Sequence, residues 1–188
     1  MINSLETLIA QILKTPPRFM NSYLIAIDGP AGAGKSTLAR RIAANWPTGN
    51  SSIVGMDDLY DGWDNALTEQ LTHTLEIQIL KPLTIGKPAS FRSYDWLSSQ
   101  FGEFKEIPKA SIYILEGVGS GQRISRKYLD QLIWIDIDQE VGLQRVLQRD
   151  GDYLEAEMRI WQMREQSHFA VENTRDCATF RFDGSLFI

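Results

Sequence analysis

The sequence predicts an α/β fold in which helices cover both faces of a parallel sheet. Short apolar runs alternate with helix-forming segments, which is the order that parallel strands and their crossover helices follow. A glycine-rich turn joins the first apolar run to the helix after it. The 188 residues are 43% apolar and 23% charged, a balance typical of a single globular domain.

Five short runs are predicted to be buried strands, because they are apolar and are bounded by turn or helix-start residues. They span residues 23–28, 51–55, 111–115, 132–137 and 178–182. The sequence therefore predicts a five-stranded parallel sheet flanked by helices.

Segments with helical periodicity are predicted to be the helices, and they span residues 3–14, 36–45, 65–80, 138–149 and 152–171. We expect Pro82 to end the third helix, and Asp138 and Asp152 to cap the last two. We expect one domain over residues 1–188, with residues 1–20 as a helical appendage. Residues 150–171, approximately, are expected to form a lid region and the helix that follows it, with Gly151 as the hinge.

Composition limits the partners of the chain. Nineteen basic and 24 acidic residues give a net charge of −5 without basic clusters, so we expect no nucleic-acid partner. No apolar run approaches the roughly 20 residues of a membrane helix, so no membrane partner is expected. The lone cysteine, Cys177, fits a cytoplasmic location. The sequence does not decide whether the chain forms a homo-oligomer.

Residues 29–36 match the pattern G-x-x-x-x-G-K-[S/T] at every fixed position, between an apolar run and a helical segment. Glycines let such a loop turn its backbone N–H groups toward phosphate oxygens, and a lysine and a hydroxyl serve the phosphates and Mg²⁺. We therefore predict a phosphate-binding loop (P-loop) for ATP and Mg²⁺. Its expected nucleotide-binding residues are Gly29, Ala31, Gly32, Ala33, Gly34, Lys35, Ser36 and Thr37.

Acidic residues follow two of the predicted strands, at the edge where open parallel sheets bind ligands. Asp57 and Asp58 follow the second strand, and Glu116 follows the third. Transfer of a phosphoryl group to an alcohol needs a carboxylate that takes the hydroxyl proton, and Asp57 or Asp58 could supply it. Glu116, with Ser36, is the expected Mg²⁺ ligand. The alternative for the two aspartates is a solvated turn.

Arg145 and Arg149 lie four residues apart on one face of a predicted helix. We expect them to stabilise the negative charge of the transferred group, and thus to act with Lys35 in catalysis. The alternative is a solvated pair on the surface.

These motifs together resemble the uridine kinase and phosphoribulokinase group of P-loop kinases over about residues 23–150. The similar segments are IDGPAGAGKSTLA, Asp57-Asp58-Leu59-Tyr60, Asp64-Asn65-Ala66-Leu67, Tyr94-Asp95-Trp96, Leu115-Glu116-Gly117 and residues 143–150. The resemblance implies a nucleoside-kinase-like fold with a lid, and it selects Asp57 as the catalytic base. It also implies that Asp64 binds ribose hydroxyls and that Tyr60, Tyr94 and Asp95 shape the acceptor pocket.

The chain departs from the group's pattern at three places. Leu59 replaces a phenylalanine, no histidine follows Trp96 where uridine kinases contact the pyrimidine, and no R-G-R run follows Asp150. The prediction is therefore an ATP-dependent kinase of a small-molecule acceptor, a nucleoside or a sugar-like compound. The alternatives are a kinase of a sugar acid or vitamin precursor, and a regulatory ATP-binding module that is not a kinase.

Overall fold

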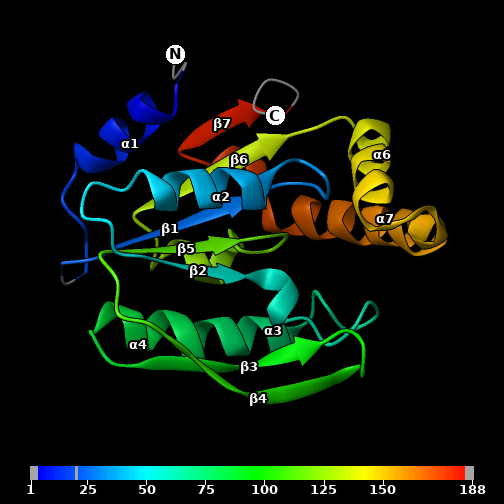
Figure 1. Cartoon of the computed structure of the whole chain (residues 1–188), viewed down its shortest axis with the longest axis horizontal. Coiled ribbons are helices and arrows are strands. Elements are labelled where there is room, and N and C mark those ends of the chain that lie inside the picture. Colours follow the sequence, from blue (N-terminus) through cyan, green and yellow to red (C-terminus); the bar gives the residue numbers. More distant parts are fainter. Residues whose placement is uncertain (1–3, 20, 185–188) are drawn as a thin grey trace.

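The computed structural model describes residues 4–19 and 21–184 of the chain. Its centre is a parallel sheet with the strand order β2-β5-β1-β6-β7 (Figure 1). The strands are β1 (Tyr23–Asp28), β2 (Ser51–Gly55), β5 (Ile112–Glu116), β6 (Gln131–Asp136) and β7 (Phe180–Asp183). The predicted five-stranded parallel sheet is confirmed, with each strand within two residues of its expected start.

The register brings the carboxyl ends of the central strands to one edge of the sheet. Glu116 of β5 is paired with Ile27 of β1 on one side and with Gly55 of β2 on the other. Asp28 ends β1, and the short helix η1 (Met56–Asp58) follows β2 directly. The acidic residues at these strand ends are therefore neighbours in space, although they are far apart in sequence.

Alternate residues of the strands feed two hydrophobic clusters, as the period of two in a strand requires. Ile25 and Ile27 face α1 (Leu5–Leu13) and α2 (Lys35–Ala44), which lie together on one face of the sheet (Figure 1). Leu24 and Ala26 face the opposite cluster. The first helix is shorter than expected, and Ser4 accepts the N–H of Thr7 at its start.

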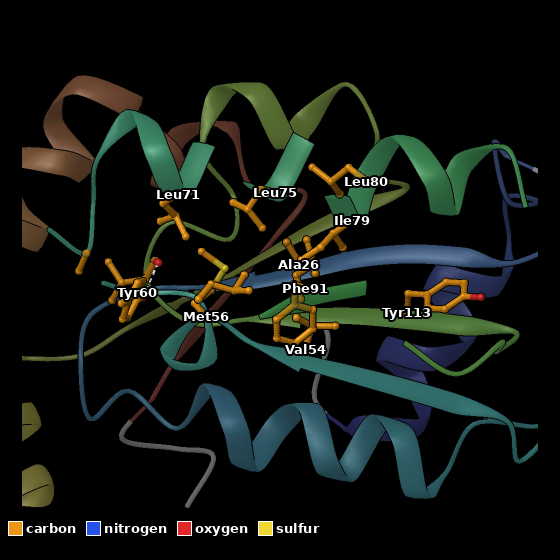
Figure 2. Packing of buried hydrophobic residues seen from close by; sticks show 14 of the residues in the cluster. Ala26, Val54, Met56, Tyr60, Leu71, Leu75, Ile79, Leu80, Phe91 and Tyr113 are labelled. Atoms are coloured by element: carbon orange, nitrogen blue, oxygen red, sulfur yellow. Dashed lines mark hydrogen bonds between the residues drawn. The ribbon is translucent and has the colours of Figure 1, made fainter. Parts of the chain in front are cut away.

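The segment after β2 forms one continuous helical stretch that was predicted to end at Pro82. It consists of α3 (Glu69–His73), the π-helix η2 (Thr74–Leu80) and α4 (Lys81–Thr84). That predicted end is wrong, because Pro82 lies in the first turn of α4, where its missing N–H costs little. Figure 2 shows Leu71 and Leu75 of this stretch packed over Met56 and Tyr60, and Ile79 beside Ala26 of β1.

A β-hairpin, which the sequence analysis did not predict, lies beside this helical stretch (Figure 1). Its strands β3 (Ala89–Asp95) and β4 (Gln100–Ile107) are antiparallel and form a separate two-stranded sheet. Ala89, Phe91 and Ile107 are buried, whereas most other residues of the hairpin are exposed or half-buried. Because only these three residues are buried, the hairpin has no continuous apolar run that would predict a strand.

The C-terminal part carries α5 (Arg123–Arg126), α6 (Gln139–Asp150), η3 (Asp152–Leu154), α7 (Glu155–Glu172) and α8 (Thr174–Cys177). Asp138 caps α6 as predicted, since it accepts the N–H groups of Glu140 and Val141. Asp152 does not cap α7 and instead begins the 3₁₀ turn η3 before it. Within the described ranges, no helix has the length and apolar character needed to cross a membrane.

Candidate active site

A cleft of about 990 Å³ opens at the carboxyl edge of the sheet. One half is lined by the P-loop, the start of α2 and the arginines of α6, and the other half is mostly aromatic. The carboxylates of Asp57 and Glu116 also line this cleft. Its other lining residues include Ala31, Gly32, Gly34, Lys35, Ser36, Thr37, Arg40, Tyr60, Trp63, Trp96, Leu97, Arg145, Arg149, Tyr153, Met158 and Trp161.

The P-loop backbone adopts a shape that side chains would prevent. Gly32 has a φ of +76°, and a Cβ atom there would lie 2.2 Å from the carbonyl oxygen of Gly142 in α6. Gly34 has a φ of +94° and precedes the first residue of α2. The loop is thus packed directly against α6 and leads into a helix N-terminus, which favours a phosphate group.

Lys35 folds back across its own loop. Its Nζ atom donates to the carbonyl oxygens of Gly29 and Pro30, each at 2.7 Å. The side chain is largely buried, but it lines the cleft. This places the one lysine of the motif where its charge can reach a phosphate held by the loop.

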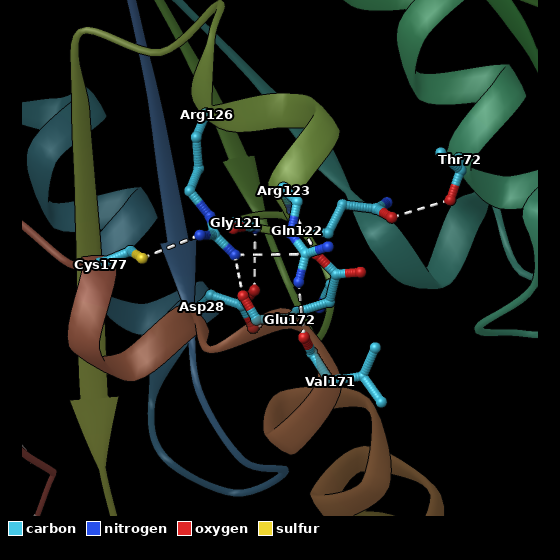
Figure 3. Close-up of polar contacts among 10 residues, drawn as sticks. Asp28, Thr72, Gly121, Gln122, Arg123, Arg126, Val171, Glu172 and Cys177 are labelled. Carbon is cyan, nitrogen blue, oxygen red and sulfur yellow. Dashed lines mark hydrogen bonds and ion pairs between the residues drawn. The ribbon is translucent and has the colours of Figure 1, made fainter.

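Asp28 fixes the loop from beneath. It is fully buried, and its carboxylate accepts N–H groups from Gly29, Gly119 and Gly121 at 2.7–3.2 Å. Burial raises the pKa of Asp28 to about 6, and these hydrogen bonds and the charge of Lys35 oppose that rise. Figure 3 shows the contact between Asp28 and Gly121. The sequence analysis did not single out Asp28.

Ser36 and Glu116 meet at the floor of the cleft. The Ser36 hydroxyl donates to Oε2 of Glu116 at 3.1 Å. Desolvation raises the pKa of the Glu116 carboxyl, and Lys35 counteracts this. Two oxygen ligands beside a phosphate loop fit Mg²⁺, which usually takes one or two protein oxygens together with phosphates and water. The described residues contain no group of three or more metal-binding side chains, so a closed protein cage is not what this cleft offers.

Asp57 and Asp58 point to different places. Asp57 lines the cleft, and desolvation raises the pKa of its carboxyl, while Lys35 and Arg149 lower it. Asp58 turns toward the hairpin, where it accepts from the Ser93 hydroxyl at 3.0 Å and pairs with Lys105 at 3.1 Å. Only the first of the two carboxylates therefore faces the site.

Arg145 and Arg149 both reach the cleft from α6, as their spacing suggested. Arg145 donates to the carbonyl oxygens of Gly32 and Gly184, at 3.4 and 3.1 Å. Arg149 forms a two-pronged contact with Asp150, at 2.7 and 2.6 Å, which raises the pKa of its guanidinium. Arg40 of α2 is a third arginine in the lining, and the sequence analysis missed it.

A series of aromatic rings lines the far half of the cleft and continues behind it to Tyr94 and Phe101. Neighbouring ring centres are 5.2–5.9 Å apart along the series Tyr60, Trp161, Trp63, Trp96, Tyr94 and Phe101. The indole N–H of Trp96 donates to the carbonyl oxygen of Asp57 at 3.0 Å. This contact links the aromatic half to the strand end that carries the candidate base.

The remaining predicted acceptor residues lie at different depths. Tyr60 is buried in the wall, and its hydroxyl donates to the carbonyl oxygen of Val118 at 2.7 Å. Tyr94 supports Trp96 from behind, and Asp95 accepts N–H and O–H groups of the turn that follows it. Asp64 is exposed and pairs with Arg164 at 2.6 Å. Tyr94, Asp95 and Asp64 are not among the residues that line the cleft.

Two residues of α7 contribute to the site without any prediction from sequence. Trp161 lies between Tyr60 and Trp63 in the aromatic series, and Glu165 accepts the backbone N–H of Ala31 in the P-loop at 3.0 Å. Both belong to the buried face of α7, together with Met158 and Gln162. Their spacing of three, four and seven residues marks this face in the sequence, although it does not reveal what the face contacts.

Known proteins with similar sequences are kinases. A uridine kinase of Streptococcus gordonii is 27% identical over 142 residues, which cover 68% of this chain and 67% of the relative. A uridine kinase of Streptococcus mutans is 25% identical over the same lengths. No family model matches the chain.

Solved structures give the fold. A possible uridine kinase from Bacillus stearothermophilus has a TM-score of 0.70 at 17% identity, covering 95% of this chain and 97% of that one. A putative fructose transport system kinase from Silicibacter sp. TM1040 has a TM-score of 0.63 at 20% identity, covering 95% and 98%. The chain therefore has the fold of the P-loop kinases. Its sequence is similar to those of uridine kinases, as the motifs predicted.

Proposed function

We propose that the chain transfers the γ-phosphoryl group of ATP to a hydroxyl group of a nucleoside or sugar-like acceptor. The observation that carries this proposal is that one cleft contains all the groups that the reaction needs. A phosphate loop, an oxygen pair suited to Mg²⁺ and the carboxylate of Asp57 lie in the same cleft as a wall of aromatic rings. A module that only binds ATP has no need for the aromatic half.

The phosphate half would hold ATP through the loop backbone and Lys35. Ser36 and Glu116 would hold Mg²⁺, which when bound supplies positive charge to the phosphate oxygens. Arg145 and Arg149 extend from α6 into the same space, where a guanidinium can stabilise charge on the transferred group. Lys35 and Arg145 are oriented by hydrogen bonds to backbone carbonyl oxygens, and such positioning favours the transition state.

Asp57 would accept the proton of the attacking hydroxyl. Its carboxyl lies in the cleft beside the aromatic wall, and its raised pKa makes it a better proton acceptor than an exposed aspartate. Lys35 and Arg149 favour its ionised form, because their charges oppose the rise in pKa that desolvation causes. Asp58 is bonded to Ser93 and Lys105 of the hairpin, so we do not assign it this role.

The aromatic half would receive the acceptor. Trp63, Trp96 and Trp161 offer ring faces, while the indole N–H of Trp96 is already bonded to the backbone. Ring stacking tolerates different bases, and the histidine that contacts the pyrimidine in uridine kinases has no equivalent after Trp96. We therefore propose that the acceptor carries a flat ring and that uridine and cytidine are poorly distinguished from each other.

An acceptor screen tests the proposal. ADP release from MgATP should be measured with and without uridine, cytidine, adenosine, ribose and a set of sugar acids. We expect at least about a tenfold stimulation by a nucleoside. Stimulation by a sugar acid alone would favour the alternative kinase, and slow ADP release that no acceptor changes would contradict kinase activity. High efficiency with uridine alone would show that another residue replaces the missing histidine.

A further inference from the structure

Glu165 is a buried acidic residue at the P-loop that the proposed reaction does not use. Its side chain is 1% exposed, and Oε2 accepts the N–H of Ala31 at 3.0 Å. In a loop of this kind, backbone N–H groups are the ligands of the phosphates. A carboxylate held at one of them brings negative charge to a site that is built for anions.

The helix that carries Glu165 is anchored on both sides of it. Toward the start of α7, the side chain of Gln162 donates to the carbonyl oxygen of Gln139 at 2.8 Å. At the end of α7, Arg123 donates to the carbonyl oxygen of Val171 at 2.8 Å, and Arg126 donates to that of Glu172 (Figure 3). Glu165 is therefore presented to the loop by a fixed helix.

The surroundings of Glu165 contain charges of both signs. Lys35 attracts its charge, whereas Asp28 beneath the loop repels it. The negative charge of Glu165 contributes to the raised pKa of Tyr60, and the Trp161 side chain donates a hydrogen bond to Glu165. Arg145 approaches the same loop from α6, at the carbonyl oxygen of Gly32. Burial has the largest effect and raises the pKa of Glu165 to about 7, so both protonation states are accessible near neutral pH.

We propose that Glu165 is a positioning residue of the P-loop that takes up a proton from solvent when ATP binds. This inference rests on the proposed function, because it requires the loop to be the nucleotide site. The phosphates of ATP place several negative charges on the loop that the carboxylate touches, and this repulsion favours the neutral acid. The neutral acid still accepts the Ala31 N–H through its carbonyl oxygen, so the loop keeps its support.

The sign of the pH dependence follows from this coupling. Below pH 7 Glu165 is already neutral and ATP binds without cost. Above pH 7 the empty site holds a carboxylate that must take up a proton from solvent when ATP binds, so the affinity for ATP falls as the pH rises. The fall approaches about tenfold per pH unit for one coupled proton.

Calorimetric titration with MgATP tests the inference in the wild-type chain and in two variants. Glu165→Gln keeps the acceptor for the Ala31 N–H and removes the charge. Glu157→Gln makes the same chemical change on the exposed side of the same helix. Titration at pH 7.5 in buffers of different ionisation enthalpy counts protons, and titration from pH 6 to 8.5 gives the change in affinity. The protonation of ATP itself is the same in all three titrations. A difference in proton uptake between the proteins therefore comes from the protein and not from ATP.

We expect the wild type and Glu157→Gln to take up a fraction of a proton more than Glu165→Gln at pH 7.5. We also expect Glu165→Gln to bind ATP up to about thirtyfold tighter than the wild type at pH 8.5, and nearly equally at pH 6. Equal proton counts in the wild type and Glu165→Gln would overturn the inference. If Glu165→Gln does not fold, a wild-type affinity that does not fall above pH 7 overturns it equally. A wild-type chain that binds no ATP would instead contradict the proposed function.

Discussion

The two halves of the cleft are built in opposite ways. The phosphate half is built around the backbone of one unbroken stretch, residues 29–36, to which Glu116 of β5 and Arg145 and Arg149 of α6 add side chains. The aromatic half comes from side chains of three separate segments, with Tyr60 and Trp63 in the loop between η1 and α3, Trp96 after β3 and Trp161 in α7. A backbone site is fixed by the fold, whereas a side-chain site can change by single substitutions. The acceptor is thus the part of the reaction that the fold constrains least.

Lys35→Ala should have the largest effect. The variant loses the mobile charge of the phosphate half, and we expect kcat/KM to fall by a factor of about 10²–10³. The fold should survive, because Lys35 lies at the surface of the cleft and bonds only its own loop. Rates of ADP release and a thermal melting curve check both parts, and equal activity in variant and parent would remove the P-loop from the account.

Asp57→Asn should lower kcat by about 10²-fold or more, since general base catalysis contributes on that scale. ATP binding should change far less. Asp58→Asn is the matched control, because its carboxylate is adjacent but bonds Ser93 and Lys105. The more damaging of the two substitutions identifies the base, and a larger loss in Asp58→Asn would move that role to Asp58.

Gly32→Ala should lower the free energy of unfolding by about 3 kcal/mol, because the added Cβ meets the backbone of Gly142. Gly49→Ala is the control, with a φ of +65° and open space around it, and should cost only about 1 kcal/mol. Urea unfolding of the two variants measures the difference. Equal losses of unfolding free energy in the two variants would mean that the P-loop shifts to accommodate the added Cβ atom, despite its packing against α6.

Trp96→Ala should raise the KM of the acceptor about tenfold and leave the KM of ATP nearly unchanged, because base stacking is worth about 1–3 kcal/mol. Trp96→Phe should recover most of the loss. Asp64→Ala should have the smallest effect, a few-fold rise in acceptor KM at constant kcat, since the resemblance assigns Asp64 only to acceptor hydroxyls that do not react. An unchanged KM for Asp64→Ala would limit Asp64 to its exposed ion pair with Arg164.

The same contrast explains what the sequence could predict. The five strands and the P-loop were predictable, because each is a contiguous pattern with a local physical cause. The hairpin of β3 and β4 was not, since only Ala89, Phe91 and Ile107 face the core and the remaining positions are mostly exposed. The helix end predicted at Pro82 is wrong because sequence alone does not show the π-helical turns before it.

Individual site residues divide in the same way. Asp57 was separable from Asp58 only through the resemblance, and the contacts of Asp58 with the hairpin give the physical reason. Trp161 reaches the cleft, and Glu165 reaches the P-loop 134 residues away in the chain, through the packing of α7, for which no local pattern exists. Tertiary contacts of this kind cannot be predicted from the local patterns of a single sequence.

Binding of the two substrates to two variants tests the separation of the halves most directly. Calorimetry should measure an unhydrolysable ATP analogue with Mg²⁺, and the best acceptor from the screen, against Lys35→Ala and Trp96→Ala. We expect Lys35→Ala to lose the nucleotide and keep the acceptor, and Trp96→Ala to keep the nucleotide and bind the acceptor about tenfold more weakly. Loss of nucleotide binding in Trp96→Ala, with an unchanged melting temperature, would contradict a cleft with one half for each substrate.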